Sequence, residues 1–376
     1  MARQRVLIVG GGFAGAYTAR RLVRRGASAV AVELVSRRNY FVFQPLLPEV
    51  AGGAVNALDT VTPLRQMLPG VGVRVAEVRG VDFESRLAEL AEGPAARLSV
   101  VPYDHLVLAF GQAAELGRFP GLAEQGYTVK EAADSFDLRN HVICCLERAG
   151  YAGDPVQRRR LLTFVVVGGG FSGVEVMGEI HELVRRALPF YREIGRGEPR
   201  FLLVEFQPRI LPELTGRLAD YAAATLRRRG IELVVGHGVR SAAAGSLELD
   251  DGRLVDTATV VATVGSGPQP LAARLGLPLE RGRIAVGGDM RLPGRDEVWV
   301  AGDAARIPLV GGGMAPPTAQ AAVREAAVLA DNILAAVAGR PTRPLVYRPR
   351  GAFASLGGGR AVAEIHIHVQ GVKVGG

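Results

Sequence analysis

Apolar residues gather in short runs along this chain and alternate with longer amphipathic stretches, the pattern of an α/β protein. Two of the runs lead directly into glycines: VLIVGGGFAG begins at Val6, and VVVGGGFSGVE begins at Val165. After each comes an amphipathic stretch and then a second apolar run. We therefore predict two strand–turn–helix–strand units, the second well inside the chain.

The glycine spacing within both turns is GxGxxG. In such a turn the first glycine makes the bend, and the second lets a pyrophosphate approach the backbone. The third lets the helix pack close to the strand. A single copy is weak evidence for a dinucleotide, whereas two complete units predict two dinucleotides. The six residues are Gly10, Gly12 and Gly15 in the first unit, and Gly168, Gly170 and Gly173 in the second.

An acidic residue follows each glycine turn at about the distance where adenosine ribose hydroxyls are held. We expect the run AVAVE to be a strand ending at Glu33, and FLLVE to be a strand ending at Glu205.

Near the C-terminus, TAQAAVREAAVLADNILAAVAG has the apolar spacing of a packed helix. We expect Pro317 in its first turn and Gly339 at its end. Most of this helix is predicted to be core, and only its N-terminal turn calls for a function.

Composition fits an enzyme of two or three domains, with 48% hydrophobic and 22% charged residues among 376. The net charge is +8, and it comes from arginine because Lys130 and Lys373 are the sole lysines. A high-GC codon bias is the simplest cause of this charge; a functional cause would be attraction to an anionic membrane surface or an anionic cofactor. No basic tract is interleaved with aromatic residues, so we expect no nucleic-acid partner.

The adjacent Cys144 and Cys145 exclude the CxxC pair of disulfide reductases, and we interpret them as helix filler. His366 and His368 could share a strand face, but two ligands without a third predict no metal site. The sequence shows no signal peptide and no run of roughly 18 apolar residues. We expect a cytoplasmic protein, either soluble or peripheral on the inner face of the cytoplasmic membrane.

Four stretches together resemble the type II NADH dehydrogenases, the non-proton-pumping NADH:quinone oxidoreductases. They are VLIVGGGFAG, RRNYFVFQPLLPEVAGG, VVVGGGFSGVE, and VWVAGDAA followed by PPTAQAA. The second stretch, at residues 37–53, is the most specific for this family. The match runs in order from residue 5 to about residue 365.

The resemblance implies an α/β fold with two Rossmann-like, doubly wound dinucleotide-binding domains, the NADH domain being inserted into the FAD domain. The FAD-binding domain would comprise residues 1–112 and 271–340, and the NADH-binding domain residues 113–270. Residues 341–376 would form a C-terminal segment, in which we recognise no membrane-anchor helices. The family also suggests a homodimer.

FAD would lie on the first unit. Asp303 would hydrogen-bond the ribityl chain, and the helix N-terminus would point at the flavin pyrimidine, where it stabilises negative charge. We expect Glu33 to hold the ribose, with Ser36 as a second contact. The residues implied are Gly10, Gly12, Phe13, Ala14, Gly15, Glu33, Ser36, Arg37, Gln44, Ala109, Gly111, Gly302, Asp303, Thr318, Ala319 and Gln320.

NADH would lie on the second unit, with Glu175 near the nicotinamide and Glu205 on the adenosine ribose. The charge of Glu205 would repel the additional phosphate of NADPH, so we expect NADH rather than NADPH, although Arg209 lies close in sequence. The remaining residues implied are Gly168, Gly170, Gly173 and Gly265. The reaction is hydride transfer from NADH to flavin N5, followed by transfer of two electrons to a quinone. The cofactors carry this chemistry, so no general acid is needed for the first half.

Glu175, Gln320 and Arg324 are the expected catalytic residues. Arg324 stands where the family commonly has a second glutamine; it could hydrogen-bond a quinone carbonyl, or it could mark another acceptor. Two alternatives therefore stay open. One is a soluble NADH-dependent reductase of a small electron-carrier protein of ferredoxin or rubredoxin type, and the other is a redox-quiet flavoprotein that senses NADH.

Overall fold

The computed structural model describes residues 3–264, 266–366, 368–369 and 372–373, with side chains described as far as residue 366. The chain forms two compact units, each assembled from three segments. Unit 1 comprises Met1–Val42, Val61–Ala113 and Ser266–Arg348, and unit 2 comprises Phe43–Thr60, Ala114–Gly265 and Pro349–Gly376. Each unit contains a parallel sheet with helices, so the predicted α/β fold class is confirmed.

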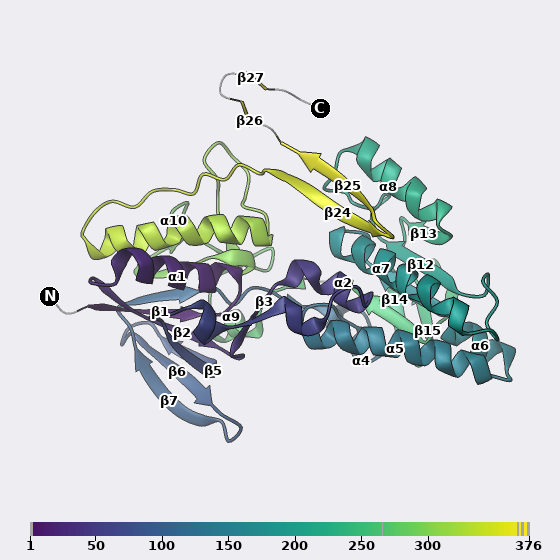
Figure 1. Ribbon diagram of the computed structural model, residues 1–376. Coiled ribbons are helices and arrows are strands. Elements are labelled where there is room, and N and C mark those ends of the chain that lie inside the picture. The colour runs from purple at the N-terminus through teal and green to yellow at the C-terminus, as the bar shows by residue number, and fades with distance from the viewer. Residues whose placement is uncertain (1–2, 265, 367, 370–371, 374–376) are drawn as a thin grey trace. The chain divides into compact units, whose positions relative to one another are not determined.

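Unit 1 is shown mainly in purple, blue and light green in Figure 1. Its elements are β1 (Gln4–Val9), α1 (Phe13–Gly26), β2 (Val30–Ser36), β3 (Tyr40–Val42), β4 (Val61–Pro63), α3 (Leu64–Met67), β5 (Gly72–Asp82), β6 (Leu87–Glu92), β7 (Arg97–Pro102), β8 (His105–Leu108), α9 (Pro270–Arg274), β19 (Leu279–Glu280), β20 (Arg283–Ala285), β21 (Arg291–Leu292), β22 (Arg295–Val300), η5 (Gly302–Ala304), β23 (Ala305–Arg306) and α10 (Ala319–Val337). The short strands β9 (Ala113–Ala114) and β18 (Ser266–Gly267) lie where the chain passes between the units.

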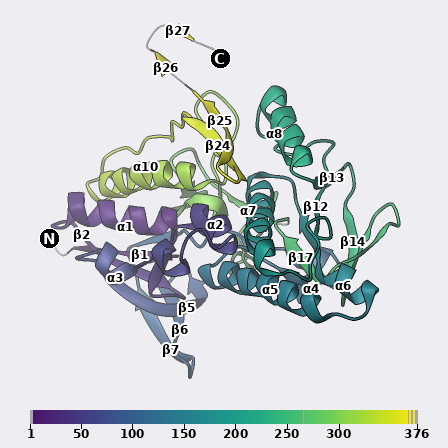
Figure 2. The ribbon, with the colours of Figure 1, turned by 45° about the vertical axis from the view of Figure 1, so that its right-hand side comes forward.

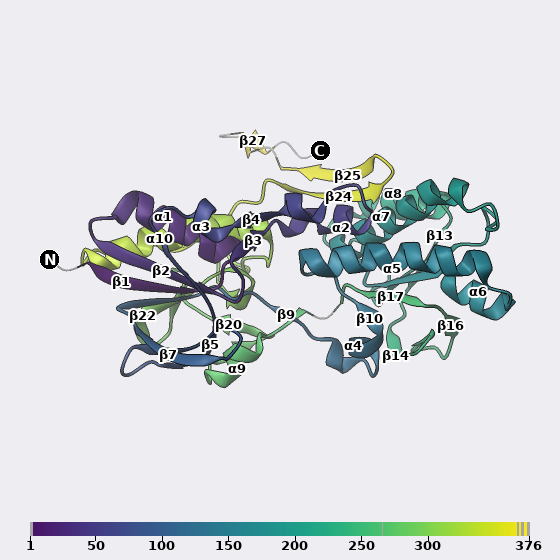
Figure 3. The same ribbon diagram turned by 60° about the horizontal axis from the view of Figure 1, so that its bottom comes forward.

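The large sheet of unit 1 has the order β21-β22-β8-β1-β2-β5-β6-β7. Strands β22, β8, β1, β2 and β5 are parallel, while β6 and β7 continue the sheet in antiparallel fashion. Residues 6–9 of β1 are all buried, as expected for a central parallel strand that is covered on both faces. Helices α1 and α10 lie side by side on one face of the sheet (Figures 1 and 3).

Unit 2 carries the second glycine turn. Its elements are η1 (Gln44–Leu46), α2 (Leu47–Ala51), η2 (Ala57–Thr60), η3 (Leu116–Arg118), α4 (Leu122–Gln125), β10 (Gly126–Tyr127), α5 (Ala132–Tyr151), α6 (Pro155–Leu161), β11 (Thr163–Val167), α7 (Phe171–Ala187), η4 (Leu188–Phe190), β12 (Arg200–Glu205), α8 (Gly216–Arg228), β13 (Ile231–Val235), β14 (Val239–Ala243), β15 (Ser246–Leu249), β16 (Leu254–Asp256), β17 (Thr259–Ala262), β24 (Gly351–Gly357), β25 (Arg360–Ile365), β26 (His368–Val369) and β27 (Val372–Lys373).

The parallel sheet of unit 2 has the order β10-β17-β11-β12-β13, and every residue of β11 is buried. Helix α2 packs against α5 and α7 (Figure 3), and the hairpin β24–β25 lies along α7 (Figure 2). Ala354, Leu356 and Val362 of the hairpin belong to the same hydrophobic core as the sheet. The hairpin is therefore an integral part of unit 2.

Helix α5 begins with a capping box in which Glu131 and Asp134 satisfy each other's backbone N–H groups. It carries the two cysteines, both free, with Cys145 buried and Cys144 exposed, so their interpretation as helix residues is confirmed. Within the described part of the chain, no helix is both long and apolar enough to cross a membrane.

Two sequence-based boundaries were wrong. Strand β2 continues past Glu33 to Ser36, because the paired strands β1 and β5 extend equally far. Helix α10 begins at Ala319 rather than at Pro317, because the Thr318 side chain accepts the N–H of Ala321 at 3.2 Å and caps the helix there. Gly339 follows the helix in a left-handed conformation, as expected for its end.

Candidate functional site

In the first glycine turn, Gly10 and Gly15 pack closely against backbone atoms, whereas Gly12 faces open space. A Cβ on Gly10 would lie 2.3 Å from the carbonyl oxygen of Ala109, and one on Gly15 would lie 1.9 Å from that of Gly10. Around Gly12 the space is empty to 4 Å, and Gly12 caps α1 without a side-chain hydrogen bond. The open position and the N–H groups of the first helical turn form a cradle of the kind that holds a pyrophosphate.

The second turn repeats this arrangement in unit 2. A Cβ on Gly168 would lie 2.6 Å from Thr263 Oγ1, and one on Gly173 would lie 1.7 Å from the carbonyl oxygen of Gly168. The nearest atom to a Cβ on Gly170 is Glu213 Oε1, 3.8 Å away, and Gly170 caps α7. The two units therefore offer equivalent phosphate cradles.

The residues that end the second strand of each unit occupy equivalent places. Gly10 N–H donates to the carbonyl of Val35 at 2.8 Å, and Gly168 N–H donates to that of Val204 at 2.8 Å. The next residues, Ser36 and Glu205, thus correspond. Glu205 accepts the N–H of Gly169 at 2.5 Å.

Ser36 lies against the first turn, because a Cβ on Gly11 would come within 2.9 Å of Ser36 Oγ. Glu33 lies three residues earlier, where its carboxylate accepts Arg74 Nε at 2.7 Å. Arg74 also donates to Glu92 at 2.6 Å, so Glu33 belongs to an ion-pair network with strands β5 and β6. The geometry places Ser36, rather than Glu33, at the strand end beside the glycines.

The other residues expected near FAD are spread over different surroundings. Phe13 is 9% exposed and lies edge-on to Phe41, with ring centroids 4.9 Å apart. Arg37 and Gln44 are exposed, and Gln44 Nε2 donates to the carbonyl of Lys130 within unit 2. Ala14 and Ala109 are buried, and Gly111 is left-handed with open space around its Cβ direction. Gly265 lies outside the described residues.

Asp303 lies in the short helix η5, next to the first glycine turn. A Cβ on Gly302 would lie 3.0 Å from the Cβ of Ala14, and the N–H of Gly302 donates to Glu325 Oε2 at 2.6 Å. Burial raises the pKa of Glu325 to about 7, opposed by that hydrogen bond. Arg283 is half-buried and faces both Glu325 and Asp303. Unit 1 thus brings its glycine turn, Asp303 and α10 together at the carboxyl ends of β1, β8 and β22, the usual place for a ligand in such a sheet.

Gln320 and Arg324 lie one turn apart on α10 and therefore share a face of the helix. Tyr347 donates its hydroxyl hydrogen to Gln320 Oε1 at 3.2 Å, a contact that no sequence motif indicates. The segment leading to Tyr347 is fixed to unit 1: Asn332 exchanges two hydrogen bonds with the backbone of Arg343, and Leu345 N–H donates to the carbonyl of Gly288 at 2.7 Å.

Three carboxylates gather in unit 2. Burial raises the pKa of Glu175 to about 7, and the charges of Glu49 and Glu179 raise it further. The N–H of Ser355 donates to Glu175 Oε1 at 3.2 Å and partly opposes this. Burial also raises the pKa values of Glu49 and Glu179. Glu175 can therefore hold or release a proton near neutral pH, and Glu49, which no motif identified, is part of its surroundings.

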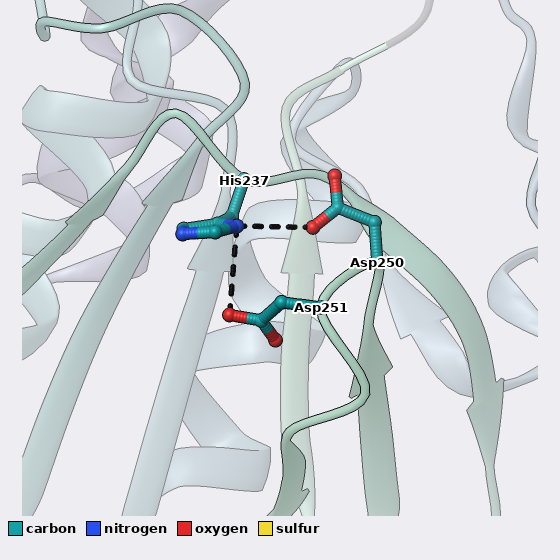
Figure 4. A group of neighbouring side chains, drawn as sticks. All are labelled: His237, Asp250 and Asp251. Carbon is teal, nitrogen blue, oxygen red and sulfur yellow. Dashed lines mark hydrogen bonds and ion pairs between the residues drawn. The ribbon is translucent and has the colours of Figure 1, made fainter.

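His237, Asp250 and Asp251 form a surface cluster beyond β13 (Figure 4). His237 Nδ1 lies 3.2 Å from Asp250 Oδ1 and 3.5 Å from Asp251 Oδ2. Asp250 also accepts the N–H of Gly238 at 2.7 Å, and Asp251 accepts Arg253 Nε at 2.6 Å. Hydrogen bonds within the protein explain this arrangement, and we assign no ion to it.

Comparison with known proteins adds four findings. The model of the pyridine nucleotide-disulphide oxidoreductase family matches residues 4–326. The type II NADH:quinone oxidoreductase Ndh of Mycobacterium tuberculosis is 31% identical over 96% of this chain and 80% of its own length. Demethylphylloquinone reductase NdbB of Synechocystis is 29% identical over 100% of this chain and 89% of its own. The structure of NDH2 from Plasmodium falciparum in complex with NADH matches with a TM-score of 0.88 at 18% identity, covering 97% of this chain and 90% of that one, which shows the shared fold.

Proposed function

We propose, because this chain belongs to the pyridine nucleotide-disulphide oxidoreductases and among them to the type II NADH:quinone oxidoreductases, that it oxidises NADH through a bound FAD and reduces a quinone. The observation that carries the proposal is the pair of equivalent glycine cradles, one in each unit. When bound, FAD is the carrier of two electrons from NADH to the acceptor. The balance is NADH, one proton and a quinone giving NAD⁺ and the quinol.

Unit 1 holds the FAD in this proposal. The cradle at Gly12 takes the pyrophosphate, and the room left there by a missing side chain supports the assignment. Ser36 and Arg37 take the adenosine ribose, because Ser36 occupies the strand end while Glu33 is engaged by Arg74. Asp303 takes the ribityl chain.

The start of α10 acts electrostatically. Its first N–H groups carry partial positive charge, which favours the negative charge of a reduced flavin ring. Thr318 caps the helix and fixes the direction of these groups. Glu325 holds the backbone of Gly302 and thereby keeps the neighbouring Asp303 in place.

Unit 2 holds the NADH. The cradle at Gly170 takes the pyrophosphate, and Glu205 takes the adenosine ribose. Glu205 is at the strand end and its carboxylate is already ordered by the N–H of Gly169, so it presents a fixed negative charge. That charge disfavours the additional phosphate of NADPH.

Gln320 and Arg324 would bind the quinone carbonyls from one face of α10. Tyr347 donates to the amide oxygen of Gln320 and so fixes the orientation of the amide. Glu175, with a pKa of about 7, supplies or takes up a proton at neutral pH. The positive charge of the chain supports a peripheral position on an anionic membrane surface. A homodimer stays a prediction from the family.

Steady-state oxidation of NADH with two kinds of acceptor tests this function. We expect turnover with a short-chain quinone that changes little between low and high salt. A reductase of an acidic carrier protein would instead turn over faster with ferredoxin or rubredoxin, and salt would suppress that rate. Slow turnover with every acceptor, together with retained NADH binding, would indicate the sensing flavoprotein.

A further inference from the structure

Unit 2 contains a cavity of about 460 Å³ between α7, the end of α8 and the turn of the β24–β25 hairpin. Its lining residues are His181, Glu182, Arg185, Arg229, Gly358 and Arg360. Neither glycine turn contributes to it, so the cavity is separate from the nucleotide cradle of this unit. Its volume falls within the range of small-molecule sites, roughly 300–1,000 Å³.

Close backbone packing brings the hairpin turn to this place. A Cβ on Gly178 of α7 would lie 2.6 Å from the carbonyl carbon of Leu356, and one on Gly357 would lie 2.2 Å from the carbonyl oxygen of Gly178. Gly358 follows with a φ of +63°, and a Cβ there would lie 3.2 Å from Glu182 Oε2. Glycine at this turn therefore keeps side chains out of a space bounded by charged groups.

Arg229 anchors the inner wall. Its guanidinium donates to the carbonyl of Leu356, to His181 Nδ1 at 2.9 Å and to Glu182 Oε2 at 3.4 Å, and its side chain is 10% exposed. Burial, and then the charge of Arg229, lowers the pKa of His181 to about 4, so this histidine is neutral at physiological pH. Arg229 thus holds the hairpin to α7 and leaves binding to the outer groups.

Positive charge at the cavity exceeds negative charge. Glu182 is 6% exposed and is shared by Arg229, by Arg185 at 2.6 Å and by Arg186 at 2.8 Å. Arg360 adds a further guanidinium, and within the described part of the chain no carboxylate pairs with it. Glu179 contributes a second negative charge near Arg229.

The charged groups around the cavity change the pKa of Arg229. Burial lowers its pKa, Glu182 and Glu179 oppose that change, and the charges of Arg360 and Arg185 lower the pKa further. Among the residues that line the cavity, the guanidiniums of Arg185, Arg229 and Arg360 thus face one carboxylate, that of Glu182. The surplus amounts to two positive charges, which a doubly charged anion would neutralise.

We propose that this cavity binds a phosphomonoester group, carried by a small solute or by a lipid headgroup, through Arg185 and Arg360. Guanidinium groups match phosphate oxygens in geometry as well as in charge. Arg185 already donates to Glu182 through Nε and Nη2, at 3.0 and 2.6 Å, so it would bind the phosphate through Nη1, whereas Arg360 would present its whole guanidinium. The cavity also leaves room beside the phosphate for the organic part of the ligand. This assignment is independent of the proposed redox function.

Inorganic phosphate is the first probe, used on the flavin-loaded protein. Thermal unfolding is followed in phosphate and in chloride at equal ionic strength, because a ligand that binds only the folded state raises the unfolding temperature. Arg360→Gln removes an exposed group, and Arg148→Gln, on the exposed side of α5, is the control for net charge. We expect phosphate to stabilise the wild type and Arg148→Gln, and to bind Arg360→Gln roughly tenfold more weakly.

A second arm distinguishes the source of the phosphate. Binding to phosphatidylcholine vesicles is measured with and without phosphatidic acid, for the same variants. Arg360-dependent binding to phosphatidic acid that inorganic phosphate weakens by competition supports the site and identifies a headgroup. Arg360-dependent stabilisation by phosphate without vesicle binding supports the site and identifies a small solute. Equal responses of the wild type and Arg360→Gln to both probes would overturn the proposal.

Discussion

Two residues at equivalent strand ends give the two cradles different charge. Glu205 ends β12 with an ordered carboxylate, whereas Ser36 ends β2 with a neutral hydroxyl. A carboxylate accepts the two hydroxyls of a ribose and repels a phosphate at the same position. We predict that this difference lets unit 2 discriminate between NADH and NADPH.

Glu205→Gln tests this discrimination. The amide keeps one oxygen that can accept the N–H of Gly169, but it removes the charge and the second acceptor, which takes the N–H of Gln207 at 2.7 Å. Thermal unfolding of the variant is therefore compared with that of the wild type. We expect the preference for NADH over NADPH, measured as the ratio of kcat/KM values, to fall roughly tenfold. Glu232→Gln, an exposed carboxylate on β13 paired with Arg200, is the matched control and should leave the ratio unchanged. An unchanged ratio in Glu205→Gln would contradict the prediction that Glu205 discriminates against NADPH.

We predict that Tyr347 affects quinone binding through its hydrogen bond to Gln320. A neutral hydrogen bond of this kind contributes about 0.5–1.5 kcal/mol, so its removal should weaken quinone binding without abolishing it. For Tyr347→Phe we expect the KM for a short-chain quinone to rise about two- to tenfold. The rate of flavin reduction by NADH should not change.

The control is Tyr191→Phe, which removes a hydroxyl that donates to Glu147 at 2.8 Å elsewhere in unit 2. Stopped-flow reduction and steady-state quinone kinetics separate the two half-reactions. A Tyr347→Phe protein that loses both rates equally would show a structural role for the tyrosine and contradict positioning of Gln320.

At the scale of elements, each cradle is a turn in which two glycines are required by packing, and we predict that the third is required by the ligand. Gly10 and Gly15 cannot carry a Cβ without meeting backbone, whereas Gly12 and Gly170 have extended backbone angles and free space. Alanine at these open positions should therefore fold normally and obstruct only the phosphate.

Gly12→Ala and Gly170→Ala provide a paired test. We expect Gly12→Ala to unfold at the wild-type temperature, compared in the flavin-free state, and to lose FAD on purification. Gly170→Ala should keep its FAD and show a KM for NADH raised about tenfold or more. Gly153→Ala, an exposed glycine with nothing within 4 Å, serves as the control. Full flavin content in Gly12→Ala would contradict the placement of the pyrophosphate.

The turns and their helices could be predicted because their signals are local: glycine spacing, an apolar run and a helical pattern lie within a few tens of residues. The end of β2 could not, because pairing with β1 and β5 carries the strand past Glu33 to Ser36. Tyr347 could not either, because its contact with Gln320 depends on a segment folded back along α10. The short helix α6 was not predicted either, although the Asp154 side chain caps it by accepting two hydrogen bonds.

At the scale of the whole molecule, family membership inferred from four short stretches is confirmed by the match over residues 4–326 and by relatives over nearly the full chain. The fold alone does not select an acceptor, because glycine cradles serve many flavoproteins. The relatives' function indicates a quinone as the acceptor, whereas Arg324 on α10, in place of the expected glutamine, fits either a quinone or another acceptor. The chemistry therefore has to be tested at the acceptor step.

The most direct measurement is an anaerobic titration of the purified protein with NADH, followed by addition of a short-chain quinone, while the visible absorption of the flavin is recorded. We predict that NADH bleaches the band promptly and that quinone restores it at a rate matching steady-state turnover. If NADH bleaches the flavin band but quinone does not restore it, the result would contradict the proposal that this protein reduces a quinone.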